Sequence, residues 1–210
     1  MVSGYSAWVS ILLGLHGINY TINSACSASS NAVGEAYVRI SSGLNSMAIV
    51  GGTEYLLTES GGYVMRNFDC LTTLTKASDG LPRPFSQERN GFLFNDGYAF
   101  SIVMEELEHA KKRNAPIYAE IVDYKANCDG YSIIMMPEDG KYSNQLIRDI
   151  VNGTDRKIDY YNAHGTGTLL NDKVEAQMLQ DVFGDKEQQP YISSTKGILG
   201  HGLGAAGVCE

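Results

Sequence analysis

The sequence predicts an α/β protein whose strands pair mostly in parallel, with helices packed on the outside of the sheet. Segments with the two-residue period of strands alternate along the chain with segments of helical period, and this alternation is typical of α/β folds. Glycine-rich turns separate the segments, and 23 of the 210 residues are glycine. A composition of 43% hydrophobic and 19% charged residues suits one globular domain or two tightly fused halves.

The first quarter of the chain is expected to run helix, strand, helix, strand. Trp8 and the leucines after it recur near one face, which predicts a helix over residues 4–14. A β-like run predicts a strand over 19–24. Small and apolar residues then predict a helix over 27–40, and the run SMAIVG predicts a short buried strand at 46–51.

The middle of the chain is less regular. Residues 54–68 are mixed and partly helical in pattern, and prolines and polar residues predict loops over 69–96. An apolar run then predicts a strand at 98–105, followed by a charged helix over 106–113 with acids first and bases last. Alternating apolar and polar residues predict a half-buried strand at 117–124.

The last third returns to regular alternation. Helical spacing predicts helices over 142–151 and 171–183. Short apolar runs predict strands at 158–163 and 191–194. A further helix is expected to begin after His201.

Composition excludes several classes of function. The net charge of −8 argues against binding to nucleic acid or to an anionic membrane surface. No apolar run reaches membrane-spanning length. The four cysteines are widely spaced with no CxxC pair, so we expect no metal site, and a reducing, cytoplasmic location is favoured.

Cys26 is the candidate nucleophile. It lies where the β-like run turns directly into small, helix-compatible residues, which places its sulfur at a helix N-terminus. Unpaired backbone N–H groups and the positive end of the helix dipole stabilise a thiolate there. Taken alone, a cysteine at this place is equally compatible with a small buried hydrophobic residue.

Two histidines far along the chain are the candidate partners of the thiol. His164 follows a strand-like run and precedes Gly-Thr-Gly-Thr, at the strand end where α/β folds place their sites. His201 lies between glycines at a predicted helix start, where the positive helix end favours a neutral imidazole. A turn-capping histidine is the alternative interpretation at both positions. A cysteine with distant histidines is typical of a thiol nucleophile assembled by the fold.

Lys196 lies five residues before His201 in an apolar, glycine-rich stretch. Its ammonium is expected either to reach solvent or to pair with a carboxylate, Glu175 and Glu210 being the candidates. Thr166 and Thr168 are expected either to bind a polar arm of a substrate or to cap the following helix.

Taken together, six segments resemble the β-ketoacyl-acyl carrier protein synthases, the condensing enzymes of fatty-acid and polyketide assembly. They occur in family order and with family-like spacing over essentially the whole chain. The Cys-His-His set resembles the elongating type rather than the initiating type with Cys-His-Asn. The matching segments are residues 24–27, 50–54, 84–92, 105–113, 162–168 and 194–210.

The resemblance implies a thiolase-like fold in which two similar α/β halves form a layered α-β-α-β-α arrangement. Residues 1–115 would be the remainder of the N-terminal half, which carries the nucleophile. Residues 116–210 would be the start of the C-terminal half, which carries the catalytic histidines. The family chain continues beyond both ends of this sequence, so we expect the fold to be truncated at both ends.

The resemblance also implies a decarboxylative Claisen condensation of an acyl thioester, held on Cys26, with malonyl-acyl carrier protein. His164 and His201 would handle the decarboxylation, which requires the sulfur to face two uncharged imidazoles across a largely dry cleft. Further roles carry over from the family by position. Lys196, with Glu175 and Glu210, would tune the electrostatics of the site. Thr166 and Thr168 would contact the phosphopantetheine arm. Phe92 and Phe68 would line the substrate pocket.

No metal or redox cofactor is implied, because phosphopantetheine arrives on the carrier protein. The implied partners are the acyl carrier protein and a second subunit, in a homodimer or in a heterodimer with a homologous chain-length subunit. Three other functions stay open: a non-catalytic ketosynthase partner, an inactive ketosynthase fragment and a Cys-His hydrolase. Retention of Cys26, His164 and His201 together argues against the first. No residue that would orient a hydrolase histidine stands out in the sequence.

Overall fold

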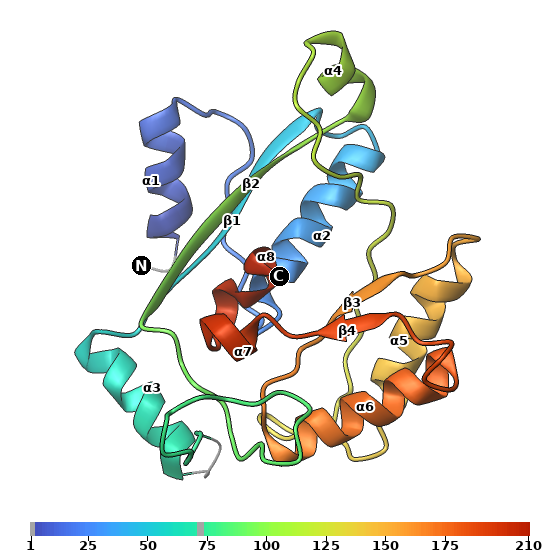
Figure 1. Ribbon diagram of the computed structural model, residues 1–210. Helices are drawn as coiled ribbons and strands as arrows, with labels where there is room; N and C mark the ends of the chain where they lie inside the picture. The colour runs from blue at the N-terminus through green and yellow to red at the C-terminus, as the bar shows by residue number, and fades with distance from the viewer. Residues whose placement is uncertain (1–2, 71–73) are drawn as a thin grey trace. The chain divides into compact units, whose positions relative to one another are not determined.

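The computed structural model describes residues 3–70 and 74–210, and the chain forms two compact units that interleave along the sequence (Figure 1). The first unit comprises the residues up to Thr53 together with Ala99–Ile117 and Leu203–Cys209. The second comprises Glu54–Tyr98, Tyr118–Gly202 and Glu210.

The first unit contains four α-helices and a 3-10 turn: α1 (Gly4–Leu13), α2 (Ala28–Ser41), α4 (Leu107–Lys112), α8 (Ala206–Cys209) and η1 (Leu203–Ala205), as far as the described residues go. It also holds most of two paired strands, β1 (Met47–Tyr55) and β2 (Gly97–Glu105). The Leu56 N–H donates to Asp96 at one end of the pair and the Glu106 N–H to Ser46 at the other, so the two strands run antiparallel.

The core of the first unit lies between α2 and the strand pair. Ala36 of α2, Val50 of β1 and Met104 of β2 are buried together. The packing is close at Gly52, where an added Cβ would lie 2.9 Å from both the Ala205 Cα and the Ser29 Cβ. The glycine therefore lets β1 approach α2 and η1 at backbone distance.

The second unit contains the helices α3 (Glu59–Cys70), α5 (Lys141–Asn152), α6 (Leu169–Phe183) and α7 (Lys196–Leu199), and the parallel strands β3 (Tyr160–Asn162) and β4 (Tyr191–Ser193). Helix α6 buries Val174, Met178 and Leu179 at helical spacing. Close approach to α6 explains Gly140 at the start of α5, where a Cβ would lie 3.0 Å from the Val174 side chain. The carboxyl ends of β3 and β4 lead directly into the histidine and lysine segments.

Most of the predicted elements are confirmed within two residues, but two strands are wrong. The short buried strand predicted at 46–51 is the longer β1, which ends four residues later and buries only Val50. Residues 19–24 form no strand, because their backbone has no ladder partner among the described residues beyond an isolated bridge from Ser24 to Cys26. Residues 117–124 form no strand and have no ladder partner among the described residues. The predicted half-burial of this segment is wrong too, because Ile117, Ile121 and Val122 are all exposed. The expectation of mostly parallel pairing is met by β3 and β4 and contradicted by β1 and β2.

Candidate active site

Cys26 lies in a hydrogen-bonded turn that opens α2, so its predicted place at a helix N-terminus is confirmed. The residue before it, Ala25, has φ +52°, a conformation that costs a non-glycine residue energy and that clusters at functional sites. The turn closes through Ala28 N–H to the Ala25 carbonyl (3.0 Å), and Asn23 accepts the Ala25 N–H (3.3 Å). The fourteen-residue helix directs its positive end toward the half-buried Cys26.

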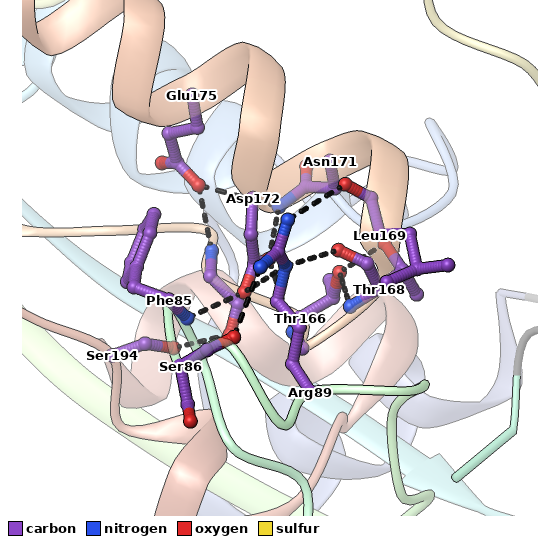
Figure 2. Close-up of polar contacts among 12 residues, drawn as sticks. Phe85, Ser86, Arg89, Thr166, Thr168, Leu169, Asn171, Asp172, Glu175 and Ser194 are labelled. Atoms are coloured by element: carbon purple, nitrogen blue, oxygen red, sulfur yellow. Dashed lines mark hydrogen bonds and ion pairs between the residues drawn. The ribbon is translucent and has the colours of Figure 1, made fainter.

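In the second unit, His164 begins a loop that is fixed by one carboxylate. The His164 and Gly165 N–H groups each donate to Glu175 at 2.8 Å, one to each oxygen. Figure 2 shows Glu175 reaching this loop from α6. Gly165 has φ +37°, and a Cβ there would lie 2.5 Å from the Ser194 Cβ. Only glycine fits this turn, which sets the direction of the preceding His164 side chain.

His201 is held by backbone bonds to the segment before β2. Its N–H donates to Leu93 (2.6 Å) and its carbonyl accepts from the Asn95 N–H (3.3 Å). The Tyr98 hydroxyl bonds the Leu199 carbonyl at 2.7 Å and lies 2.9 Å from that of Gly200. The turn that carries His201 is therefore held by backbone bonds to residues 93 and 95 and by the hydroxyl of Tyr98.

The structure brings the two predicted histidines of the second unit together. Their ring centroids are 5.4 Å apart with an interplanar angle of 85°, an edge-to-face pair. Burial, then His164, then the Lys196 ammonium lower the pKa of His201 to about 2. Burial and Lys196 lower the pKa of His164 to about 3. His164 is an exposed residue, so solvent offsets part of the effect of burial on its pKa, and both imidazoles are neutral at pH 7.

His201 was predicted to be neutral because of the positive end of a following helix. In the structure, burial of the 3% exposed residue is the largest cause of its low pKa, ahead of His164 and Lys196.

Lys196 is 2% exposed and forms an ion pair with Glu210, as predicted for one of its two candidate partners. Glu175, the other candidate, binds the backbone of the His164 loop instead. Desolvation raises the pKa of Glu175, and its hydrogen bonds to Gly165, His164, Tyr161 and Asn171 act against that rise.

A cluster of three phenylalanine rings contacts His201 through Phe92. Phe92 lies edge-to-face with His201 (5.5 Å between centroids), and Phe68 lies edge-to-face with Phe92 at 5.6 Å. Phe94, which sequence reasoning missed, completes the cluster at 4.9 Å from Phe92. The rings exclude water from one side of the imidazole. The pocket-lining roles of Phe92 and Phe68 stay predictions.

The hydroxyls of Thr166 and Thr168 lie 2.9 Å apart, and Thr168 precedes α6 without a capping bond from its side chain. The Thr168 side chain therefore does not cap α6, while the Thr166 hydroxyl accepts the Thr168 N–H at 3.4 Å directly before the helix. Binding of a substrate arm stays a prediction.

Two further residues that the sequence did not single out fix this loop (Figure 2). Asp172, 1% exposed, accepts the N–H groups of Phe85 (2.7 Å) and Gly167 (3.1 Å), tying together segments 82 residues apart. Arg89 donates to the Thr168 carbonyl and lies 3.9 Å from Asp172. Arg89 lies in the family-like segment 84–92, but nothing in the local sequence marks Asp172 as buried.

Replacing Gly202 by alanine should destabilise the protein by about 3 kcal/mol, the upper range for overpacking. The added Cβ would overlap the Tyr98 ring, which is pinned by its hydroxyl. Chemical denaturation of the variant measures the loss. Gly17→Ala is the matched control, because nothing lies within 4 Å of a Cβ there, and equal stability of the two variants would contradict the packing.

Replacing Glu210 by glutamine should cost about 3–5 kcal/mol, because it leaves the buried Lys196 ammonium without its partner. The double variant Lys196→Met/Glu210→Gln should recover a large part of this loss. Urea unfolding of the wild type, both single variants and the double variant gives the coupling free energy. A coupling near zero would show that the pair does not contribute.

Comparisons with known proteins agree on one family. The profile "Beta-ketoacyl synthase, N-terminal domain" matches residues 1–110, and "Beta-ketoacyl synthase, C-terminal domain" matches residues 118–210. The 3-oxoacyl-[acyl-carrier-protein] synthase 1 of Escherichia coli K12 is 39% identical over all of this chain and 50% of its own length. A Saccharomyces cerevisiae homologue of such synthases is 36% identical over 96% of this chain and 46% of its own. The chain spans about half the length of the curated relatives it matches.

Solved structures agree with this and confirm the predicted thiolase-like α/β fold class. A β-ketoacyl synthase from Burkholderia phymatum is 35% identical with a TM-score of 0.86, over 99% of this chain and 50% of its own. The AntDE:AntF complex is a type II polyketide ketosynthase with its acyl carrier protein. It matches with a TM-score of 0.87 and 29% identity, over 97% of this chain and 51% of its own. In the part of the chain that the structure describes, no helix is long and apolar enough to cross a membrane.

Proposed function

Because the chain belongs to the β-ketoacyl synthase family, we propose that it catalyses the condensing step of fatty-acid or polyketide assembly. An acyl group carried on Cys26 is joined to a malonyl thioester on an acyl carrier protein, with loss of CO2. The observation that carries this proposal is the pair of neutral, edge-to-face imidazoles beside a buried lysine in the second unit.

The first half-reaction is transfer of the acyl group. The Cys26 thiolate attacks the carbonyl of an acyl thioester, and the carrier protein's thiol leaves with the proton that Cys26 gave up. The positive end of α2 stabilises the thiolate, and the strained Ala25 turn presents the sulfur ahead of the helix. No cofactor of the enzyme takes part, because the phosphopantetheine arm belongs to the carrier protein.

The second half-reaction generates the nucleophile. Malonyl thioester loses CO2, and the electron pair of the broken C–C bond moves into the thioester to give an enolate. A neutral imidazole carries one N–H, so His164 and His201 together offer two donors to the enolate oxygen as charge develops. Protonated imidazoles would bind the malonyl carboxylate and oppose its loss, so their low pKa values favour the reaction.

The last step forms the new C–C bond. The enolate carbon attacks the acyl-Cys26 carbonyl, and collapse of the tetrahedral intermediate expels the Cys26 thiolate. The β-ketoacyl product stays on the carrier protein and the enzyme is regenerated. Thr166 and Thr168 on the loop after His164 are proposed to contact the pantetheine arm, and Phe92 and Phe68 to line the substrate pocket.

The proposed partners are an acyl carrier protein and a second ketosynthase-type subunit, identical or homologous. Among the similar structures, one is a ketosynthase bound to its carrier protein and another is a ketosynthase/chain length factor. The cytoplasmic location stays a prediction.

The proposal is tested by incubating the chain with two forms of the carrier protein, one carrying an acyl group and one carrying a malonyl group. The products are followed by mass spectrometry. A carrier protein bearing an acyl chain extended by a β-keto two-carbon unit is the expected result. Free fatty acid without extension would indicate a hydrolase. Neither product, with the chain shown to be folded, would favour the non-catalytic partner or an inactive ketosynthase.

A further inference from the structure

A tyrosine of β3 has no part in the mechanism above, yet it contacts the carboxylate behind His164. The Tyr161 hydroxyl donates to the Glu175 Oε1 at 3.2 Å. Its neighbour Tyr160 faces elsewhere, with its hydroxyl 2.6 Å from the Ser193 hydroxyl. Consecutive strand residues point to opposite faces, which accounts for the difference.

Glu175 accepts four hydrogen bonds in a buried place, two on each oxygen. Oε1 receives the His164 N–H at 2.8 Å and the Tyr161 hydroxyl. Oε2 receives the Gly165 N–H at 2.8 Å and the Asn171 amide at 3.3 Å. Only the ionised carboxylate accepts from all four donors, because a protonated carboxyl turns one oxygen into a donor that opposes an N–H.

Among the described residues, no positive charge pairs with Glu175 directly, and its burial disfavours the ionised carboxylate. The residue is 3% exposed, and burial raises its pKa. The ammonium of Lys196 is committed to Glu210, so it does not neutralise Glu175 directly. The other charged or titratable groups of the surrounding elements are His164, which is neutral, Glu210, which is paired with Lys196, and Asp172 of α6. Asp172 accepts from the Phe85 and Gly167 N–H groups and from the Asn171 amide, and it lies 3.9 Å from Arg89. Hydrogen bonds therefore decide the balance.

Among the four donors, Tyr161 is the side chain that can be altered without disturbing the loop itself. Burial, Glu175 and Glu210 raise its pKa, so the hydroxyl keeps its proton and always donates. The backbone donors belong to the turn that is being held, and Asn171 also bonds Asp172.

We propose that Tyr161 is a positioning residue that keeps Glu175 ionised and, through Glu175, fixes the backbone turn from which the His164 imidazole projects. Its effect on catalysis rests on the function proposed above, but its effect on Glu175 does not. Tyr161→Phe should raise the proton affinity of Glu175 about tenfold, or about one pKa unit, as expected for one lost donor to a buried charge.

The test is an infrared pH titration of the whole chain. The C=O stretch of a protonated buried carboxyl is followed as pH falls, and Glu175→Gln assigns the band. We expect the midpoint in Tyr161→Phe about one unit above wild type, and that of the matched control Tyr160→Phe unchanged. Coincident midpoints of wild type and Tyr161→Phe would overturn the proposal.

A second measurement keeps the test decisive if Glu175→Gln does not fold. The amide proton of Gly165, which donates to Glu175, reports the carboxylate's charge by its NMR chemical shift. Its titration midpoint should move upward in Tyr161→Phe and not in Tyr160→Phe. An unmoved midpoint speaks against Tyr161 as the residue that sets the charge.

The effect of Tyr161→Phe on catalysis is measured separately from its effect on the charge of Glu175. If the wild type condenses, the acid limb of its kcat profile should shift upward in Tyr161→Phe by the same unit, with KM unchanged. If the wild type does not condense, the proposed function fails while the infrared and NMR titrations still decide the role of Tyr161. An unshifted acid limb in an active Tyr161→Phe variant would remove the link to catalysis.

Discussion

Replacement of Cys26 by alanine should abolish condensation, with a loss in kcat on the order of 10⁴ or more, as for other enzymes deprived of a covalent nucleophile. No other group in the proposed mechanism can carry the acyl chain. Decarboxylation should survive, because it depends on His164 and His201 in the other unit. The variant should therefore release CO2 from malonyl-carrier protein without forming a β-keto product.

The measurement pairs two readouts on the same protein. Acyl transfer is followed by the mass of the intact chain after exposure to an acyl thioester, and CO2 release is followed from labelled malonyl thioester. Cys128→Ala is the matched control, since this cysteine is exposed and should have no role. Peptide mapping after chloroacetyl or cerulenin-like labelling should find Cys26 modified ahead of Cys128. Equal labelling of both thiols would remove the case for an activated nucleophile.

Local patterns predicted the positions of the reactive groups better than the contacts that hold them. The small residues after Cys26 predicted a helix start there, and the glycines around His164 and His201 predicted turns. The helix and turns formed because these preferences are set by the residue's own backbone and its near neighbours. The strand predicted at 117–124 failed for the opposite reason, since its pairing depends on a distant backbone.

The residues that support the site, such as Asp172 and Tyr161, could not be predicted from local sequence patterns. Asp172 follows Thr168 by one helical turn, and its role comes from Phe85, 87 residues away in the sequence. In the sequence, Tyr161 has the pattern of an ordinary strand residue. Its role becomes visible only in the structure, where Glu175 of α6 accepts a hydrogen bond from it. The main cause of the low pKa of His201 was not predicted, because the burial of this residue is a product of packing. The sequence predicted that His164 and His201 belong to one site, and the tertiary fold supplies the burial and the Lys196 charge that lower their pKa values.

Replacement of His201 by alanine should reverse the pattern expected for Cys26. Loss of one donor to the enolate should lower the rate of CO2 release by about 10²–10³-fold, the range for an oxyanion donor. Acylation of Cys26 should persist, because it does not require the enolate. His16→Ala, which alters an exposed histidine, is the control and should leave both readouts unchanged. Undiminished CO2 release in His201→Ala would contradict the proposed use of the imidazole pair.

The same histidine should make folding stability depend on pH, with a sign fixed by its pKa. The pKa of His201 is about 2 in the folded chain and 6.5 as a reference, so below pH 6.5 the unfolded chain binds the extra proton. Stability is therefore full above pH 6.5 and falls by about 1.4 kcal/mol per pH unit below it, or about 2 kcal/mol at pH 5 from this residue alone. His201→Gln should lose that part of the slope. Urea unfolding at several pH values compares the two, and parallel curves for wild type and His201→Gln would mean that the imidazole is not held neutral by burial.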